Sequence, residues 1–294
     1  MIEQPLLSVV VPTLNRPQAI VDLVHDFQTQ DYPRFEMIVV DASTAENIQL
    51  ADIAKNDSRL RVIRITTGGT CVARNTGVRA AQGAIIVFTD DDVRLADNKF
   101  LLAHSSHYDD ENIAGVGGRV LDVNQELNRE QTGPVCRVTK TGRIYPNATS
   151  TVSQDINAPR GGNMSFRKQI IVDVGMFDEQ FRGNAMREET DFSLRVVEAG
   201  WRIVFEPRAS LTHLALAGGS RTAVRLTWYR DFFFNENYFF LKHFPNRYLP
   251  MLLVRKARAM AACWLYYGHG KISWLLAPWQ SFAQAKKLVH TSRA

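Results

Sequence analysis

The stretch that most constrains the fold is Ile85-Ile86-Val87-Phe88-Thr89, which runs directly into Asp90-Asp91-Asp92. A continuous apolar run of this length, rich in branched side chains, predicts a central strand that is covered on both faces. Three adjacent carboxylates cannot lie unpaired in such a core, because a buried charge without a counter-ion is strongly unfavourable. We therefore expect the acids at the carboxyl end of the strand, where open α/β sheets bind ligands.

The three acids allow more than one interpretation. Converging carboxylates repel one another unless a cation joins them, and Mg²⁺ or Mn²⁺ with a phosphorylated ligand is the natural partner. The plain alternative is an acidic loop that faces solvent, because short motifs often arise without a function. A calcium loop of the EF-hand type is excluded, since Leu95 stands where that loop needs Gly and Leu101 where it needs its closing Glu.

Around this stretch, strand and helix patterns alternate along the chain. This order is typical of right-handed crossovers and a mainly parallel sheet, so the predicted fold class is α/β. Neither GxGxxG nor GxxxxGK[ST] occurs, which excludes the ordinary dinucleotide and P-loop phosphate sites. The predicted strands are 6–11, 35–40, 60–65 and 85–89, and the predicted helices cover about 18–30, 45–56 and 71–81.

The second half of the chain is less regular. Residues 122–158 are polar and poorly periodic, and we expect an irregular excursion there that could include a hairpin. The paired glycines Gly161 and Gly162 favour backbone packed against a bound molecule. The other predicted elements are a helix over about 98–108, a strand near 114–120 and short extended pieces at 203–206 and 209–213.

A helix predicted over 188–199 begins with Glu188, Glu189 and Asp191. Its acids could simply complement the helix dipole, with Asp191 paired to Arg195 one turn later. That explanation does not require two consecutive glutamates. His213, taken alone, is more often a core or loop histidine than a metal ligand.

Composition excludes several classes of protein. The 294 residues are 45% hydrophobic and 22% charged, as in an ordinary globular protein. Three cysteines without paired spacing argue against a disulfide framework or a zinc site, so a reducing, cytoplasmic setting is expected. We find no signal-peptide pattern at the N-terminus and no apolar window long enough to span a membrane.

The C-terminal part, residues 224–294, is basic and aromatic. It holds 11 Lys and Arg against Asp231 and Glu236, and four of the five tryptophans. Helices are expected over about 249–267 and 274–288. Packing on the rest of the chain, a homodimer contact, and a peripheral contact with the inner face of a membrane all remain open. Nucleic-acid binding rests on the basic charge alone and is not expected.

In their order and spacing, these motifs resemble an inverting family 2 glycosyltransferase with the GT-A fold. The resemblance covers about residues 6–221. It is carried by VVVPTLNRP at 9–17, VVDAST at 39–44, ARNTG at 73–77, FTDDD at 88–92, GGNMSF at 161–166, EETDFSLR at 188–195, GWRIVFEP at 200–207 and THL at 212–214.

The resemblance implies a set of site residues. The metal, Mg²⁺ or Mn²⁺, would be held by Asp90, Asp92 and His213. The base would be Glu189, with Glu188 and Asp191 as acceptor contacts or orienting groups. The donor nucleotide-sugar would be bound by Pro12, Thr13, Asn15, Arg16, Asp41, Arg74, Asp90, Asp91, Gly162, Asn163 and Arg221.

The resemblance also implies an organisation and a substrate class. Residues 1–223 would form the GT-A catalytic domain, with a nucleotide-binding half over about 1–120 and an acceptor half over about 121–223, followed by the helical extension 224–294. The donor would be a UDP-, GDP- or dTDP-sugar, and the choice stays open because Ala42 stands where relatives often carry a base-contacting residue. The acceptor would be a glycan or a lipid-linked glycan.

Two other functions are alternatives to a glycosyltransferase. One is a non-catalytic nucleotide-sugar or membrane-binding protein. The other is a sugar-phosphate nucleotidyltransferase, which needs a glycine-rich loop that residues 12–17 lack.

Overall fold

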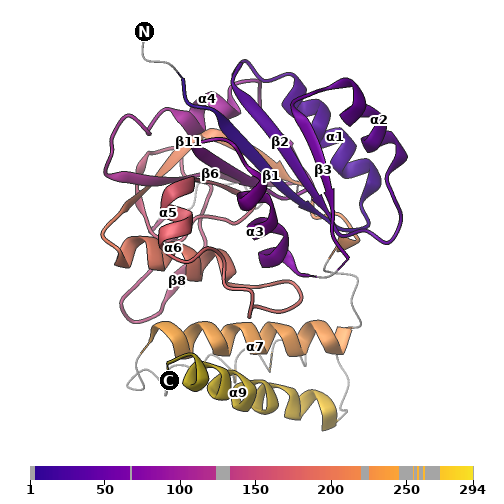
Figure 1. Ribbon diagram of the computed structural model, residues 1–294. Coiled ribbons are helices and arrows are strands. Elements are labelled where there is room, and N and C mark those ends of the chain that lie inside the picture. Colours follow the sequence, from indigo (N-terminus) through magenta and orange to yellow (C-terminus); the bar gives the residue numbers. More distant parts are fainter. Residues whose placement is uncertain are drawn as a thin grey trace.

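The computed structural model describes residues 4–66, 68–123, 133–219, 225–244 and 272–293, together with Val254, Ala257 and Ala261. Its centre is a nine-stranded sheet in the order β3-β2-β1-β4-β10-β6-β11-β5, with β9 paired to β11 (Figure 1). The strands of this sheet are β1 (Leu7–Thr13), β2 (Phe35–Asp41), β3 (Leu60–Arg64), β4 (Ile85–Thr89), β5 (Val93–Leu95), β6 (Ile113–Asp122), β9 (Gln154–Ile156), β10 (Asn163–Arg167) and β11 (Arg202–His213).

The first half of the sheet is parallel, as predicted. β3, β2, β1 and β4 run in one direction. β10 is antiparallel to both of its neighbours, β4 and β6, and β11 is again parallel to β6. The α/β class is therefore confirmed, and the antiparallel β10 lies in the middle of the sheet.

Both faces of the sheet are buried, which explains the continuous apolar runs. Along β1, Val10 points into one hydrophobic core, whereas Val9 and Val11 point into another. Helices α3, α5 and α6 cover the first core, and α1 and α4 cover the second (Figure 1). Alternation with a period of two is thus present in the structure although positions 9–11 are all valine.

The predicted helices are confirmed with shifted ends. Only the helix expected over 249–267 cannot be placed, because it lies mainly outside the described residues. The helices are α1 (Pro17–Gln28), α2 (Ile48–Asn56), α3 (Thr70–Ala80), α4 (Phe100–Ser105), α5 (Lys168–Asp173), α6 (Glu188–Glu198), α7 (Arg225–His243) and α9 (Ile272–Arg293).

Two strand predictions turned out differently or more fully, and one strand was not predicted. The two extended pieces at 203–206 and 209–213 are one strand, β11, whose register shifts between Glu206 and Ser210 and so accommodates Pro207. The expected hairpin is present as β7 (Arg137–Val138) and β8 (Ile144–Tyr145). No local pattern indicated that the residues after Gly162 form the central strand β10.

The helices of the extension pack against the rest of the chain. In Figure 1, α7 and α9 lie side by side across the end of the molecule, next to α6. Phe234, Tyr238, Phe239 and Phe240 of α7 belong to the same core as α6, whereas Tyr229 and Phe233 pack with Ala277 of α9. Aromatic residues cover most faces of α7 because two partners bury it from different sides.

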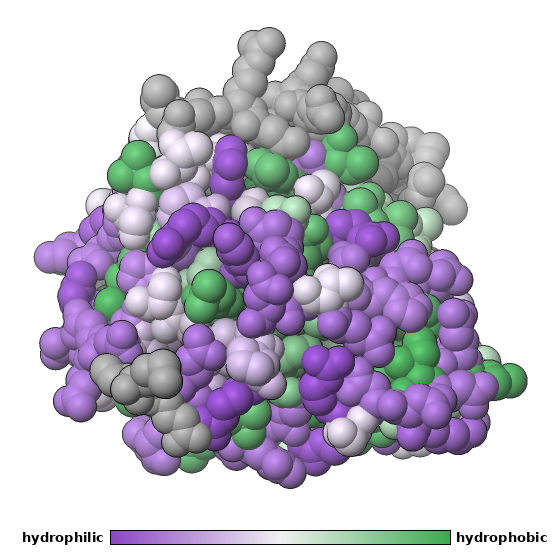
Figure 2. Space-filling model, turned by 90° about the horizontal axis from the view of Figure 1, so that it is seen from above, coloured by the Kyte–Doolittle hydropathy of each residue, from purple (hydrophilic) through white to green (hydrophobic). Residues whose placement is uncertain are grey.

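The face of the molecule on the side away from α7 and α9 is mostly hydrophilic. Figure 2 views it from above, and hydrophobic residues there form only small groups. Among the helices that the structure describes, none combines the length and the apolar character needed to cross a membrane.

Candidate active site

One large cavity lies where the strands β1, β4 and β11 end. Its volume is about 970 Å³. The lining comes from segments far apart in sequence: the loop after β1, the start of α3, the turn before β10 and the loop that leads into α6. Of the predicted site residues, Pro12, Thr13, Arg16, Arg74, Asp90, Asp91, Asp92, Gly162, Glu188, Glu189 and His213 line it.

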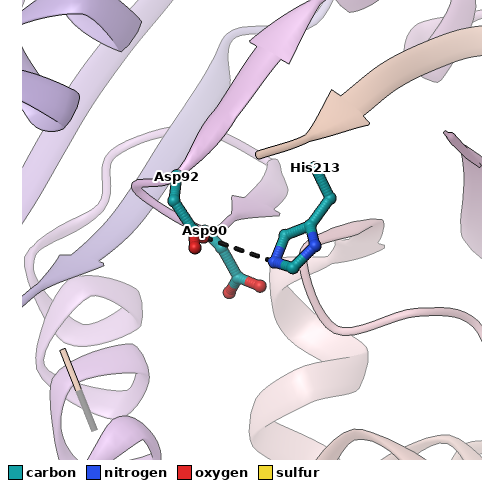
Figure 3. Close-up of side chains that lie close together, drawn as sticks. All are labelled: Asp90, Asp92 and His213. Carbon is teal, nitrogen blue, oxygen red and sulfur yellow. Dashed lines mark ion pairs between the residues drawn. The ribbon is translucent and has the colours of Figure 1, made fainter. Parts of the chain in front are cut away.

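The three consecutive acids point in different directions. Asp91 is 4% exposed and turns toward β1, where Thr13 Oγ1 donates a hydrogen bond of 2.7 Å to its Oδ2. Burial raises the pKa of Asp91, although the hydrogen bond from Thr13 and the charge of Arg16 act in the opposite direction. Asp90 and Asp92 instead point toward β11 (Figure 3).

Asp90, Asp92 and His213 form a group that fits a divalent metal ion. One donor atom of each lies within 4.8 Å of the others, and His213 Nε2 is 3.5 Å from Asp92 Oδ1 (Figure 3). Asp92 Oδ2 is buried and accepts no hydrogen bond from the part of the chain that the structure describes. Two carboxylates and an imidazole are a donor set that suits Mn²⁺ and Mg²⁺.

Arg16 neutralises part of this acidic group. Its Nη1 lies 2.6 Å from Asp91 Oδ1 and 3.2 Å from Asp92 Oδ2. Its Nη2 also donates hydrogen bonds to the carbonyl oxygens of Leu216 (2.9 Å) and Gly218 (3.3 Å). Arg16 therefore ties the segment after β11 to the acids after β4.

Arg74 joins the acids after β4 to the acids of α6. Its side chain is 2% exposed, forms an ion pair with Glu188, and reaches Asp90 Oδ1 at 3.6 Å. Nη2 donates a hydrogen bond of 3.0 Å to the carbonyl oxygen of Gly161. Because Arg74 and Glu188 are both buried, each is the counter-ion that the other requires.

Glu189 is the acid of α6 that remains available for chemistry. It is half-buried and lines the cavity, whereas Glu188 is 4% exposed and paired. Within the described part of the chain, its one side-chain hydrogen-bond donor is Thr190 Oγ1, 3.5 Å from Glu189 Oε1. A Cβ on Gly161 would come within 3.3 Å of Glu189 Cβ, so the turn before β10 packs directly on this residue.

Asp191, the third predicted acid of α6, lies away from the cavity. It is fully buried and pairs with Arg195 (3.0 Å), Lys242 (2.8 Å) and His243 (2.7 Å), the last two from α7. Burial would raise the pKa of Asp191, but the hydrogen bond from His243 and the charges of Arg195 and Lys242 outweigh it and hold the pKa at about 2. The structure thus places Asp191 where it joins α6 to α7, and not where it could contact an acceptor.

Asp191→Asn is expected to lower the free energy of unfolding at pH 7 by about 2–3 kcal/mol, because the neutral amide loses the charge interaction with Arg195 and Lys242 that lowers the pKa of Asp191. The folded-state pKa of Asp191 is below its ordinary value of 3.8, so its contribution is present above about pH 4 and is lost as the pH falls toward 2. Urea unfolding at pH 7 and near pH 3 measures this. The exposed Asp173 is the matched control, and a difference between wild type and Asp191→Asn that did not shrink at low pH would contradict the prediction.

Three predicted donor-binding residues support the rim of the cavity and do not line it. Asp41 is 2% exposed, and its Oδ2 accepts a hydrogen bond of 2.6 Å from Arg64. Asn15 has a left-handed backbone (φ 53°) and its side-chain oxygen accepts a hydrogen bond from the backbone of Thr44. Asn163 is fully buried and donates hydrogen bonds to a carbonyl oxygen of the neighbouring strand β6 and to one of β11, the strand beyond it. Arg221 lies outside the described residues.

Sequence reasoning missed one wall of the cavity. Trp228 and Tyr229 of α7 line it together with Gly183, Asn184, Ala185 and Met186 of the loop before α6. The aromatic pair at the start of α7 was visible in the sequence. However, nothing local indicated that a helix of the extension lines this cavity.

The sequence matches Glycosyl transferase family 2 over residues 8–175, more than half of the chain. The chain belongs to glycosyl transferase family 2. The matched region includes the acids after β4 and the turn before β10. It ends before Glu188, so the acids of α6 and the whole of α7 lie beyond it.

This family 2 chain has curated relatives that are longer than the matched part. The poly(ribitol-phosphate) beta-N-acetylglucosaminyltransferase TarS of Staphylococcus aureus strain Mu50 is 32% identical over 151 residues, 47% of this chain and 26% of TarS. The uncharacterized glycosyltransferase EpsJ of Bacillus subtilis strain 168 is 39% identical over 90 residues, 30% of this chain and 26% of EpsJ. The matches therefore span about a quarter of each relative.

Solved structures confirm the GT-A fold of this family 2 chain. The mannosyltransferase PcManGT from Pyrobaculum calidifontis, in complex with GDP-Man and Mn²⁺, has a TM-score of 0.62 at 20% identity, over 98% of this chain and 84% of that protein. Residues 1–349 of S. aureus TarS with UDP-GlcNAc have a TM-score of 0.60 at 20% identity, over 80% of this chain and 66% of that protein.

Proposed function

We propose that this chain is an inverting glycosyltransferase that moves a sugar from a nucleotide-sugar donor to an acceptor hydroxyl. One observation carries the proposal: Glu189, a carboxylate free to act as a base, lines the same cavity as Asp90, Asp92 and His213, the group that fits a divalent metal ion. Such a transfer requires both features, a cation at the leaving group and a base at the nucleophile.

The donor is a nucleoside diphosphate sugar, with uridine, guanosine or deoxythymidine as the nucleoside. Among similar structures, TarS is named with UDP-GlcNAc and PcManGT with GDP-Man. In this chain Pro12 and Thr13 at the end of β1, and Arg16 in the loop that follows, would bind the nucleotide. Asp41 and Asn15 would support that loop from outside the cavity, through their hydrogen bonds with Arg64 and Thr44.

Mg²⁺ or Mn²⁺ would be held by Asp90, Asp92 and His213. When bound, such an ion supplies positive charge that neutralises a leaving diphosphate. The protein's own contribution is to hold the ligands: Arg74 restrains Asp90, and Arg16 lies beside Asp92. The cavity also brings the backbone of Gly162 close to Asp90, since a Cβ there would meet Asp90 Oδ2 at 2.5 Å.

Glu189 would accept the proton of the acceptor hydroxyl at a carboxylate oxygen as the new bond forms. A hydroxyl is a weak nucleophile, so this transfer lowers the barrier. A single base with a single displacement inverts the anomeric centre, whereas retention would need a carboxylate nucleophile beneath the sugar. Glu188 would act by fixing the first turn of α6 through Arg74.

The nucleotide-binding half would lie in about residues 1–120 and the acceptor half in about 121–223, followed by the extension 224–294. A surface glycan, polysaccharide or glycolipid is the acceptor class that we propose, with the reaction at the cytoplasmic side of the membrane. In the described part of the extension, α7 and α9 pack on the rest of the chain. A peripheral membrane contact or a homodimer through 224–294 would use other surfaces of these helices and stays a prediction.

The first experiment is a thermal-shift and hydrolysis screen of UDP-, GDP- and dTDP-sugars with Mn²⁺ or Mg²⁺ on wild type and Asp92→Asn. One donor is expected to stabilise wild type only when metal is present, and Asp92→Asn should lose that response because a ligand oxygen is replaced by an amide. The exposed Asp109→Asn should behave as wild type. A donor that bound equally well to Asp92→Asn without metal would contradict the proposed metal site.

A further inference from the structure

We propose that α7 is a positioning element of the active site, in which Asn235 and Glu236 hold the loop 182–187 so that Glu189 faces the cavity. The residues concerned lie beyond the region matched by the family. The inference depends on the proposed function only for the chemical role of Glu189. That α7 holds the loop is a statement about structure and can be tested without a substrate.

The loop has a backbone that needs outside support. Ala185 (φ 49°) and Arg187 (φ 79°) both have left-handed backbone angles, although neither is glycine. Arg187 directly precedes Glu188 and caps α6 without a side-chain hydrogen bond. Non-glycine residues keep such angles only where neighbouring groups hold them, so the direction of the first turn of α6 depends on the contacts of this loop.

Asn235 holds the beginning of the loop. Its Oδ1 accepts a hydrogen bond of 2.9 Å from the backbone nitrogen of Arg182, and its Nδ2 donates one of 2.8 Å to the carbonyl oxygen of the same residue. The Asn235 side chain is fully buried. An amide that pairs with both backbone groups of one residue fixes the position and the orientation of that residue.

Glu236 holds the end of the loop. Its Oε1 lies 2.5 Å from Nε of Arg187, and both side chains are largely buried, with exposures of 14% and 19%. Solvent screens such a pair less than it screens a surface pair. The loop between these two anchors packs directly on α7, because a Cβ on Gly183 would lie 2.4 Å from Asp231 Oδ2.

Asn235 belongs to a face of α7 that makes polar contacts. Asp231, Asn235, Tyr238 and Lys242 recur at spacings of four, three and four residues, and so lie on one side of the helix. Tyr238 donates a hydrogen bond of 2.9 Å to Asp178, before the loop, and Lys242 lies 2.8 Å from Asp191, after it. In Figure 1 the segment that leads into α6 runs along α7. Hydrogen bonds and ion pairs are directional, whereas apolar packing is not, so this face orients the segment in addition to burying it.

The test uses the full-length protein with Glu236→Ala, Asn235→Ala and the conservative Glu236→Gln. Amide hydrogen exchange is measured over residues 182–191 without ligand. We expect faster exchange there in both alanine variants, an intermediate rate in Glu236→Gln, and no change in the matched control Glu111→Ala, whose side chain is exposed. Unchanged exchange in both alanine variants, with folding intact, would overturn the inference whatever the activity.

The kinetic arm separates positioning from a merely structural role. With the donor found in the screen, kcat of Glu236→Ala should fall ~10- to 100-fold, because a small misplacement of a catalytic group is costly, while the KM for the donor stays as in wild type. Glu236→Gln should recover part of kcat. Faster exchange with an unchanged kcat would overturn the positioning role. If wild type transferred no sugar at all, faster exchange in the variants would uphold the loop contact, and the proposed function alone would fail.

Discussion

Replacing Glu189 with Gln is expected to lower the turnover of sugar transfer by ~10²–10⁴-fold, the range for loss of a general base. The amide keeps the size of the side chain but cannot accept the proton of the acceptor hydroxyl. Glu189 is half-buried and takes part in no ion pair within the described residues, so its replacement should leave the melting temperature nearly unchanged. Donor binding with metal should persist, because Asp90, Asp92 and His213 are intact.

The measurement is a transfer assay together with a thermal-shift titration of donor and metal. Glu111→Gln, an exposed glutamate, is the matched control. Glu188→Gln distinguishes the two adjacent acids: it should lower the melting temperature, because Arg74 loses its partner, whereas Glu189→Gln should not. Full turnover by Glu189→Gln would remove Glu189 as the base.

Replacing Arg74 with Met is expected to lower the free energy of unfolding by about 3–5 kcal/mol and to abolish most of the transfer activity. Methionine is long, apolar and adaptable, so the main effect is electrostatic: Glu188, 4% exposed, would be left as a buried charge without a counter-ion. Activity should fall as well, because Arg74 also restrains Asp90 and the carbonyl oxygen of Gly161. Urea unfolding and the transfer assay measure the two effects.

Helix α3 offers its own control. Arg79 lies on the same helix with a side chain that is 61% exposed, so Arg79→Met should change stability by no more than about 0.5 kcal/mol. Adding Glu188→Leu to Arg74→Met should restore much of the stability, because both charges are then absent, while the activity stays low. If the double variant were no more stable than Arg74→Met alone, the loss would not come from the charge of Glu188.

The sequence predicted those features that depend on local pattern. The apolar run of β4 followed by three acids correctly placed the acids at the end of a central strand, and the alternation of strands and helices gave the α/β class. Family motifs led to Asp90, Asp92 and His213, which the structure brings within 4.8 Å of one another. Such predictions succeed because periodicity and burial are properties of neighbouring residues.

Other features could not be predicted because their partners are distant in the chain. The direction of each acid after β4 depends on Thr13, Arg16 and His213. Asp191 lies away from the cavity because Lys242 and His243 contact it from α7. Similarly, the residues after Gly162 form an antiparallel strand only because β4 and β6 lie on either side.

Local sequence pattern is therefore sufficient to predict most of the helices and strands, the end of the sheet that carries the acids and the chemical types of the candidate site residues. Which acids face the cavity, which are neutralised by arginine, and how α7 contributes a wall to the site follow only from the packed chain. The physical reason is that a charged or polar side chain takes its orientation from the partner that satisfies it, and in this fold those partners come from elements that meet only after the sheet and the extension have packed together.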